Sequence, residues 1–184
     1  DRAGIVGADG ETHQGIFDLS FFNIVPNLVI MAPKNFKELE DMLEFAIKYN
    51  GPIYIRYPRG GEENIKIEHE DKIQRAYEVS NILKKEKIGI KVINARFLKP
   101  LDEENIINWI GNSKIITLED NIVKGGLGST IIELLNRYNK TNEIKTLGYP
   151  DEFIKQATVD EIEKKYNLDT ESILNTIRKW SKYE

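Results

Sequence analysis

Residues 28–56 read LVIMAPKNFKELEDMLEFAIKYNGPIYIR and place two short apolar segments on either side of an amphipathic one. The segments at 28–32 and 53–56 are of strand length, and the first is continuously apolar, as is typical of parallel strands covered on both faces. Between them Asn35 is a suitable helix N-cap, and apolar residues then recur at helical spacing as far as Ile47. Strand, helix and strand in this order predict a right-handed parallel crossover, with ligands at the carboxyl ends of the strands.

The composition of the whole chain fits a globular protein without a membrane anchor. Hydrophobic residues make up 40% of the chain and charged residues 30%, an ordinary balance for a water-exposed domain. No apolar run approaches the roughly 20 residues that span a bilayer, and no signal-peptide pattern opens the chain. The absence of cysteine excludes disulfides and thiolate metal sites and suits a reducing cytoplasm, and His13 and His69 are too few for a histidine-rich metal site.

The charges argue against a nucleic-acid partner. The formal net charge is only -4, and the lysines alternate with acidic residues instead of clustering on one face. Arg56 and Arg59 are therefore a local feature at the end of the second predicted strand. Such a pair has the right chemistry to hold one phosphate group.

A change of composition after residue 60 predicts two domains. Residues 61–72 are rich in Gly, Glu, Asn and Lys and show little periodicity, so we expect a linker between a domain at 1–60 and a second α/β domain at 73–184. Periodicity and caps predict helices near 12–24, 35–50, 76–83, 102–111, 127–135 and 170–180, and a further helix start at the capping box 158–161. Strands are predicted near 28–32, 53–56, 88–95, 114–118 and 144–147.

Two glycine-rich segments are candidates for ligand contact. The first is DRAGIVGADGETHQG at residues 1–15, whose glycines permit sharp turns and close approach to a ligand. Its composition alone favours a solvated surface loop, and Glu11 and Gln14 have no evident partner. The second is GGLG at 125–128, before a predicted helix. It resembles a phosphate cradle but lacks the Lys-Ser/Thr ending of a nucleotide P-loop, so close backbone packing or a dimer contact is the better interpretation.

Four blocks of the sequence together resemble one enzyme family. They are DRAGIVGADGETHQG at 1–15, FDLSFF at 17–22, IYIRYPRG at 53–60 and VINARFLKPLD at 92–102. In these blocks the chain resembles the 1-deoxy-D-xylulose-5-phosphate synthases, thiamine-diphosphate enzymes of the transketolase superfamily. The resemblance implies the second half of a pyrimidine-binding domain followed by a transketolase-type C-terminal α/β domain. It also implies that the catalytic glutamate and the magnesium-diphosphate motif lie upstream of Asp1.

The resemblance implies a reaction and a role for four residues. The family condenses pyruvate with D-glyceraldehyde 3-phosphate, with loss of CO2, in a homodimer that needs thiamine diphosphate and Mg2+; the product feeds isoprenoid, thiamine and pyridoxal biosynthesis. Arg2 and Arg59 match the residues that grip the acceptor phosphate, and Asp9 matches one near the hydroxyl or aldehyde of the acceptor. His13 matches a histidine near the reactive carbon of the cofactor. Strand alternation gives Arg56 a supporting role.

Two other interpretations remain open at this stage. The chain also fits a transketolase or the beta subunit of a 2-oxo acid dehydrogenase, although the three blocks at 1–10, 12–15 and 57–60 favour the synthases. By itself it also fits a non-catalytic binding or dimerisation fragment, and we expect the isolated chain to be inactive. One departure from the family is visible: the strand and glycine turn that precede the helix at 76–83 in the synthases are missing between His69 and Arg75. Either this region is shorter than in the synthases, or some of its residues are missing from the sequence as numbered here. We favour the second explanation.

Overall fold

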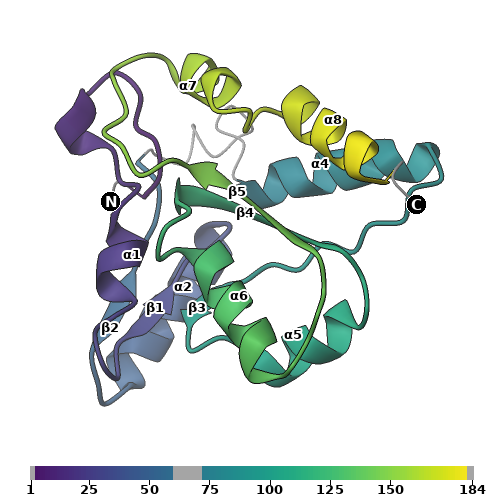
Figure 1. Cartoon of the computed structure of the whole chain (residues 1–184). Coiled ribbons are helices and arrows are strands. Elements are labelled where there is room, and N and C mark those ends of the chain that lie inside the picture. Colours follow the sequence, from purple (N-terminus) through teal and green to yellow (C-terminus); the bar gives the residue numbers. More distant parts are fainter. Residues whose placement is uncertain (1–2, 60–71, 182–184) are drawn as a thin grey trace.

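The structure is a computed structural model and describes residues 3–59 and 72–181. It is an α/β fold with two small sheets, of strand order β2-β1-β3 and β4-β5 (Figure 1). The helices are α1 (Asp18–Phe22), α2 (Phe36–Lys48), α4 (Lys72–Lys85), α5 (Glu103–Ile110), α6 (Leu127–Arg137), α7 (Val159–Lys165) and α8 (Thr170–Ser181), with a 3-10 turn η1 (Glu11–His13). The strands are β1 (Val29–Met31), β2 (Ile53–Ile55), β3 (Phe97–Lys99), β4 (Ile115–Ile122) and β5 (Ile144–Tyr149).

The first sheet confirms the predicted strand-helix-strand unit. β1 and β2 pair in parallel, with Val29 opposite Ile53, and α2 connects them. The side chain of Asn35 accepts a hydrogen bond from the backbone N–H of Glu38 at 2.9 Å, which begins α2 at the predicted cap. β1 is buried along its whole length, as a strand covered on both faces requires.

The prediction of a strand at 88–95 is wrong, because these residues form no hydrogen-bonded pairing with any described strand. The apolar side chains of this segment are used for packing instead: Ile88 and Ile90 lie against the α4/α8 cluster, and Ile93 lies against the α5/α6 cluster. The strand begins later, at Phe97, and pairs antiparallel with β1 of the first sheet. Residues 97–99 therefore join the part of the chain after the predicted linker to the part before it.

The second sheet forms the middle layer of three. α5 and α6 pack on one face, around Ile115 and Ile144, and α4 and α8 pack on the other, around Leu118 and Leu147 (Figure 1). β4 and β5 are parallel and connected through α6. Both predicted strands are confirmed and are longer than predicted. Within the described part of the chain, no helix is long and apolar enough to cross a membrane.

Capping residues in the sequence correctly predict where three helices of the second half begin. Asp102 accepts a hydrogen bond from the backbone N–H of Asn105, and Asp169 accepts one from that of Ser172. Thr158 forms a capping box with Glu161, since each side chain accepts from the other residue's backbone. These contacts confirm the predicted starts of α5, α7 and α8.

The predicted helix at 12–24 is only partly present. It is divided into η1 and α1 by Gly15, which forms an antiparallel bridge with Gly4. The N–H and C=O of Gly15 are hydrogen-bonded to Gly4 and cannot take part in helical hydrogen bonds. The predicted linker at 61–72 lies outside the described residues except for Lys72, which begins α4.

Candidate functional site

The glycine-rich segment forms a loop that is closed at its base. The N–H of Gly4 donates to the carbonyl of Gly15 at 2.7 Å, and the N–H of Gly15 returns a bond to the carbonyl of Gly4 at 2.8 Å. Gly4 has a φ of +84°, and a Cβ added there would lie 1.8 Å from Oδ2 of Asp120. Only glycine can hold this backbone conformation against the end of β4. The loop base is thus pressed onto the second sheet.

Two of the four predicted site residues come together on the outer side of this loop. Asp9 lies in the loop, and Arg59 lies beyond the carboxyl end of β2, 50 residues away, yet Nη1 of Arg59 pairs with Oδ2 of Asp9. Both side chains remain accessible, with 34% of Asp9 and 55% of Arg59 exposed. The N–H of Ala3 donates to the carbonyl of Tyr57 at 3.0 Å and ties the loop to the same strand end.

The other two predicted residues are placed differently. His13 lies in η1 on the same loop and is exposed, with its Nδ1 3.2 Å from the hydroxyl of Thr12. Its own backbone N–H donates to Gly10 at 3.2 Å. Arg2 lies outside the described residues. The structure therefore brings Asp9 and Arg59 together, places His13 nearby in sequence on the same loop, and leaves the position of Arg2 open.

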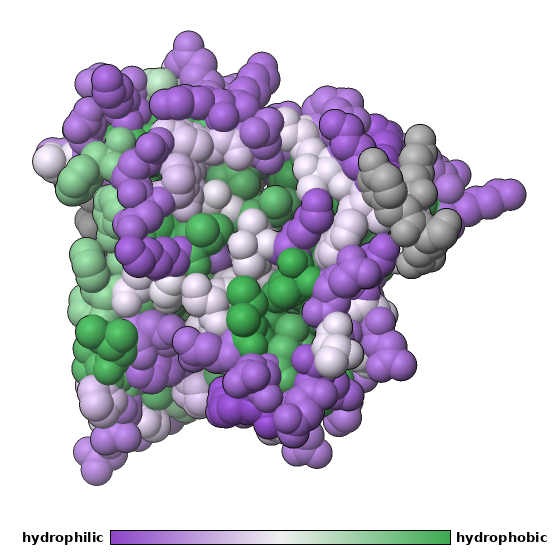
Figure 2. Space-filling view, in the orientation of Figure 1, coloured by the Kyte–Doolittle hydropathy of each residue, from purple (hydrophilic) through white to green (hydrophobic). Residues whose placement is uncertain are grey.

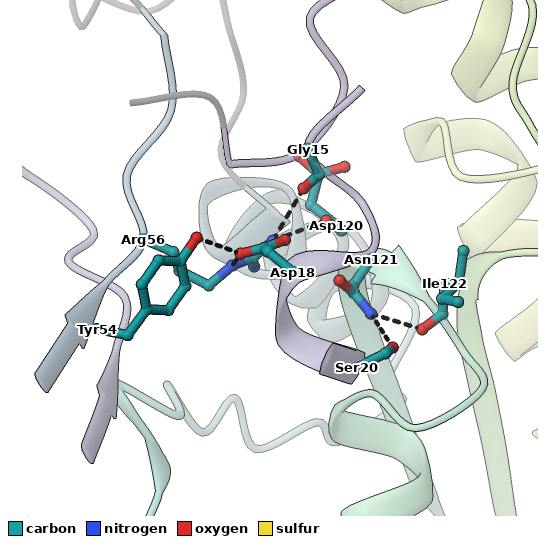
Figure 3. Close-up of polar contacts among 8 residues, drawn as sticks. All are labelled: Gly15, Asp18, Ser20, Tyr54, Arg56, Asp120, Asn121 and Ile122. Carbon is teal, nitrogen blue, oxygen red and sulfur yellow. Dashed lines mark hydrogen bonds and ion pairs between the residues drawn. The ribbon is translucent and has the colours of Figure 1, made fainter. Parts of the chain in front are cut away.

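Arg56 does not face a ligand, because it is buried in the protein (Figure 3). Its Nε donates to Oδ2 of Asp18 at 2.8 Å, and its Nη2 donates to Oδ1 at 3.0 Å. The same Nη2 lies 3.3 Å from the carbonyls of Gly15 and Asp120. Burial acts to lower the pKa of Arg56, but its bonds to Asp18 outweigh this and raise the pKa, so the guanidinium stays charged. Arg56 therefore supports the loop base and is no partner of Arg59 in holding a phosphate.

The sequence reasoning missed Asp18, which anchors this cluster. Tyr54 donates to Oδ2 of Asp18 at 3.0 Å, and burial together with the Asp18 charge raises the pKa of Tyr54 to about 12. The available signal was an acidic residue alone in the apolar block FDLSFF, because a lone charge among buried positions needs a partner. Strand alternation predicts that Arg56 and Tyr57 point to opposite faces of the sheet, but it names no partner for Arg56.

A second set of polar contacts joins α1 to the end of β4. The side-chain amide of Asn121 donates to the hydroxyl of Ser20 at 3.0 Å and to the carbonyl of Ile122 at 2.8 Å (Figure 3). Ser20 donates onward to the carbonyl of Lys124 at 2.7 Å. Asn121 is fully buried, and these bonds satisfy its side-chain nitrogen, whereas its Oδ1 has no hydrogen-bond partner among the described residues. They fix the candidate site to the second half of the chain.

The GGLG segment holds a carboxylate of the chain itself. The N–H groups of Leu127 and Gly128 donate to the two carboxylate oxygens of Glu119, at 2.7 and 2.9 Å. A Cβ added at Gly126 would lie 2.0 Å from Oε2 of Glu119. Burial raises the pKa of Glu119 to about 7, against the opposing effect of the two backbone bonds. The glycines thus serve close packing at a helix start that Glu119 already occupies.

The described residues offer no obvious metal site. Among residues 3–59 and 72–181, no group of three or more His, Asp or Glu side chains is arranged to hold a metal ion. The described residues of the site offer the carboxylates of Asp9 and Glu11 and the imidazole of His13 from the loop, together with the guanidinium of Arg59 from the end of β2. This donor set can bind and orient an anionic, oxygen-rich substrate and exchange a proton with it.

Two family profiles match the chain. Residues 1–61 match the transketolase pyrimidine-binding domain, and residues 71–173 match the transketolase C-terminal domain. The second match alone covers more than half of the 184 residues.

Two curated relatives of the chain share a name. The chain is 42% identical over 202 positions to the 1-deoxy-D-xylulose-5-phosphate synthase of Clostridium tetani and 41% identical to that of Caldanaerobacter subterraneus. These alignments cover 97% and 96% of this chain but only 33% and 32% of the relatives, so the chain spans about a third of their length. The alignment of 202 positions exceeds the 184 residues here, so the C. tetani relative carries residues that this chain lacks.

Solved structures agree in fold. A chain described as a split gene transketolase, inactive beta4 tetramer, superposes with a TM-score of 0.78 at 24% identity, covering 94% of this chain and 64% of that one. The transketolase of Campylobacter jejuni superposes with a TM-score of 0.68 at 17% identity, covering 97% and 30%. At these identities the superpositions show the fold alone.

Proposed function

Because the chain belongs to the transketolase family, we propose that it is the acceptor-binding part of a thiamine-diphosphate-dependent synthase that condenses pyruvate with D-glyceraldehyde 3-phosphate. The products are 1-deoxy-D-xylulose 5-phosphate and CO2. The name shared by the relatives at 41–42% identity supports this choice over a transketolase or a 2-oxo acid dehydrogenase. We place the boundary between its two domains within the predicted linker at 61–72.

The pairing of Asp9 with Arg59 is the observation that carries the proposal. An exposed ion pair contributes only about 0–1 kcal/mol, so a phosphate dianion can displace the carboxylate from Arg59 at little cost. A guanidinium stays charged and binds phosphate oxygens through two parallel bonds. Asp9, once released, is a neighbouring acceptor for a hydroxyl of the same substrate. Arg2 is the second cation that we propose for the phosphate.

His13 is the residue that we propose for proton transfer. Its imidazole is exposed on the loop that carries Asp9, four residues away in sequence. Imidazole exchanges protons near neutral pH, which suits a reaction in which a carbonyl oxygen gains a proton and later loses it. In this proposal Arg59 and Asp9 hold the acceptor while His13 serves the reacting carbonyl.

Thiamine diphosphate, when bound, supplies the carbanion chemistry of the family. The described residues show no cluster of metal-binding side chains. We propose that Mg2+ and the cofactor are bound by the part of the relatives that lies outside the match. A homodimer is part of the proposal. Apolar side chains exposed on α1 and α6, such as Phe21 at 65% and Ile132 at 47%, support pairing (Figure 2).

The test is an assay of the full-length protein with thiamine diphosphate and Mg2+. We expect CO2 release from pyruvate to depend on D-glyceraldehyde 3-phosphate and to yield one five-carbon ketose phosphate. His13→Ala should lower kcat strongly, whereas Glu11→Gln, an exposed change on the same loop, should not. Transfer of a two-carbon ketol unit between sugar phosphates without CO2 release would favour a transketolase instead. Acyl transfer to a lipoyl group would favour a dehydrogenase.

A further inference from the structure

Among the described loop residues 3–15, Gln14 is the one buried polar side chain. Only 5% of it is exposed, although Asp9 and the residues of η1 beside it are exposed. Its side-chain oxygen accepts the backbone N–H of Val6 at 2.8 Å, and its side-chain nitrogen donates to the carbonyl of Gly7 at 3.1 Å. One amide thus binds backbone groups of two consecutive residues, Val6 and Gly7, on the opposite side of the loop.

These bonds add a second crosslink directly above the loop base. The first crosslink is the backbone pair between Gly4 and Gly15. Together the two crosslinks fix both sides of the segment from which Asp9 and His13 project. In the outer part of the loop, residues 8–13, the N–H of His13 donates to the carbonyl of Gly10 at 3.2 Å. The orientation of the outer part of the loop therefore depends on the crosslink that Gln14 makes.

We propose that Gln14 is a positioning residue for this site, which fixes the loop so that Asp9 reaches Arg59 and His13 faces the substrate. This inference rests on the proposed function. The role needs an amide specifically, because a donor and an acceptor must be present at the same end of one side chain. Ionised glutamate keeps the acceptor and loses the donor. Methionine fills a similar volume and supplies neither, which leaves a buried N–H and a buried carbonyl without their partner.

The first measurement follows the crosslink without an activity assay. Amide hydrogen exchange of Val6 should be at least about tenfold faster in Gln14→Met, because that N–H loses its acceptor. The buried amides of β4 should exchange at the wild-type rate, which shows that the variant is folded. Glu11→Gln is the matched control and should leave Val6 unchanged. Unchanged exchange of Val6 in Gln14→Met would overturn the crosslink.

The second measurement, on the full-length protein, separates positioning from mere support of the fold. Gln14→Met should lower kcat/KM for D-glyceraldehyde 3-phosphate by about tenfold or more, through both kcat and KM, when it is assayed well below the thermal midpoint of the variant. Gln14→Glu should regain activity relative to wild type as the pH falls, since the neutral carboxyl donates to Gly7 as the amide does. Wild-type kinetics in Gln14→Met, or no recovery in Gln14→Glu at low pH, would overturn the positioning role.

The two possible failures can be told apart. If wild-type protein does not condense the two substrates, the proposed function is wrong, and the positioning role with it, even if Val6 exchange confirms the crosslink. If the wild type is active and Gln14→Met is equally active, the function stands and the positioning role falls.

Discussion

Arg56 binds Asp18 through two nitrogens, at 2.8 and 3.0 Å, and the side chains are 8% and 16% exposed, respectively. This pair lies under the base of the glycine-rich loop, because Arg56 also contacts the carbonyl of Gly15. A buried charge that loses its partner costs much more than an exposed one. The stability of the fold and the position of the loop therefore depend on the same two residues.

We predict that Arg56→Met destabilises the chain by about 3–5 kcal/mol in urea unfolding, because it leaves Asp18 buried without a cation. Arg137→Met is the matched control: its pair with Glu103 is exposed, so it should cost at most about 1 kcal/mol. The double variant Arg56→Met/Asp18→Leu should recover part of the loss. Equal losses of unfolding free energy in Arg56→Met and Arg137→Met would show that the Arg56–Asp18 pair stabilises the fold no more than an exposed pair does.

We predict that Gly128→Ala destabilises the chain although Gly128 lies in a helix. Alanine would favour α6 by about 1 kcal/mol through helix propensity. Its Cβ would however lie 2.5 Å from Thr146 and 2.9 Å from Thr117, and overpacking of a core costs about 1–3 kcal/mol. We expect the clash to outweigh the propensity in thermal unfolding. Gly89→Ala, where a Cβ meets nothing within 4 Å, is the control.

Local signals predicted the parts of the fold that depend on neighbours in sequence. The unit at 28–56 follows from two strand-length segments and an Asn35 cap, and its two parallel strands, its helix and the cap are confirmed. The prediction of a strand at 88–95 is wrong because an apolar run indicates that the side chains are buried, but not whether they pack against a strand or a helix. Its side chains pack on helices, and the antiparallel strand at 97–99 depends on β1, more than 60 residues earlier.

Some features of the candidate site are likewise visible in the sequence, and others depend on contacts that form only in the folded chain. The glycines and the charged residues of the loop are visible in the sequence, and the pairing of Asp9 with Arg59 follows once both lie near one strand end. No spacing rule joins Arg56 to Asp18, 38 residues apart, or Glu119 to the start of α6. Arg56 and Asp18 meet only when α1 packs beside the end of β2, and Glu119 meets the N–H groups of Leu127 and Gly128 only when α6 folds back onto β4. Gln14 had no visible partner because both of its partners are backbone groups, which every sequence offers.

We predict that the stability of the chain falls between about pH 5 and pH 8 through Glu119. Burial raises the pKa of Glu119 from 4.5 to about 7, so the folded state binds the proton more tightly than the unfolded state. The stabilising contribution is complete below about pH 4.5 and is lost as the pH rises through 7, a change on the order of 3 kcal/mol. Glu119→Gln should flatten this part of the profile of unfolding free energy against pH. An identical slope in wild type and variant would contradict the assignment to Glu119.

The last prediction separates stability from substrate binding at Arg59. Its pair with Asp9 is exposed, so Arg59→Ala should change the free energy of unfolding by less than about 1 kcal/mol. The same variant should raise the KM of the full-length protein for D-glyceraldehyde 3-phosphate by about tenfold or more, because each charge-assisted bond to a phosphate contributes about 1.5–3 kcal/mol. The KM for pyruvate, which carries no phosphate, should change much less. Arg178→Ala is the matched control, since it breaks a partly exposed pair with Glu86 far from the loop in sequence and should leave both KM values unchanged. Equal increases in both KM values on Arg59→Ala would mean that Arg59 holds the loop and not the acceptor phosphate.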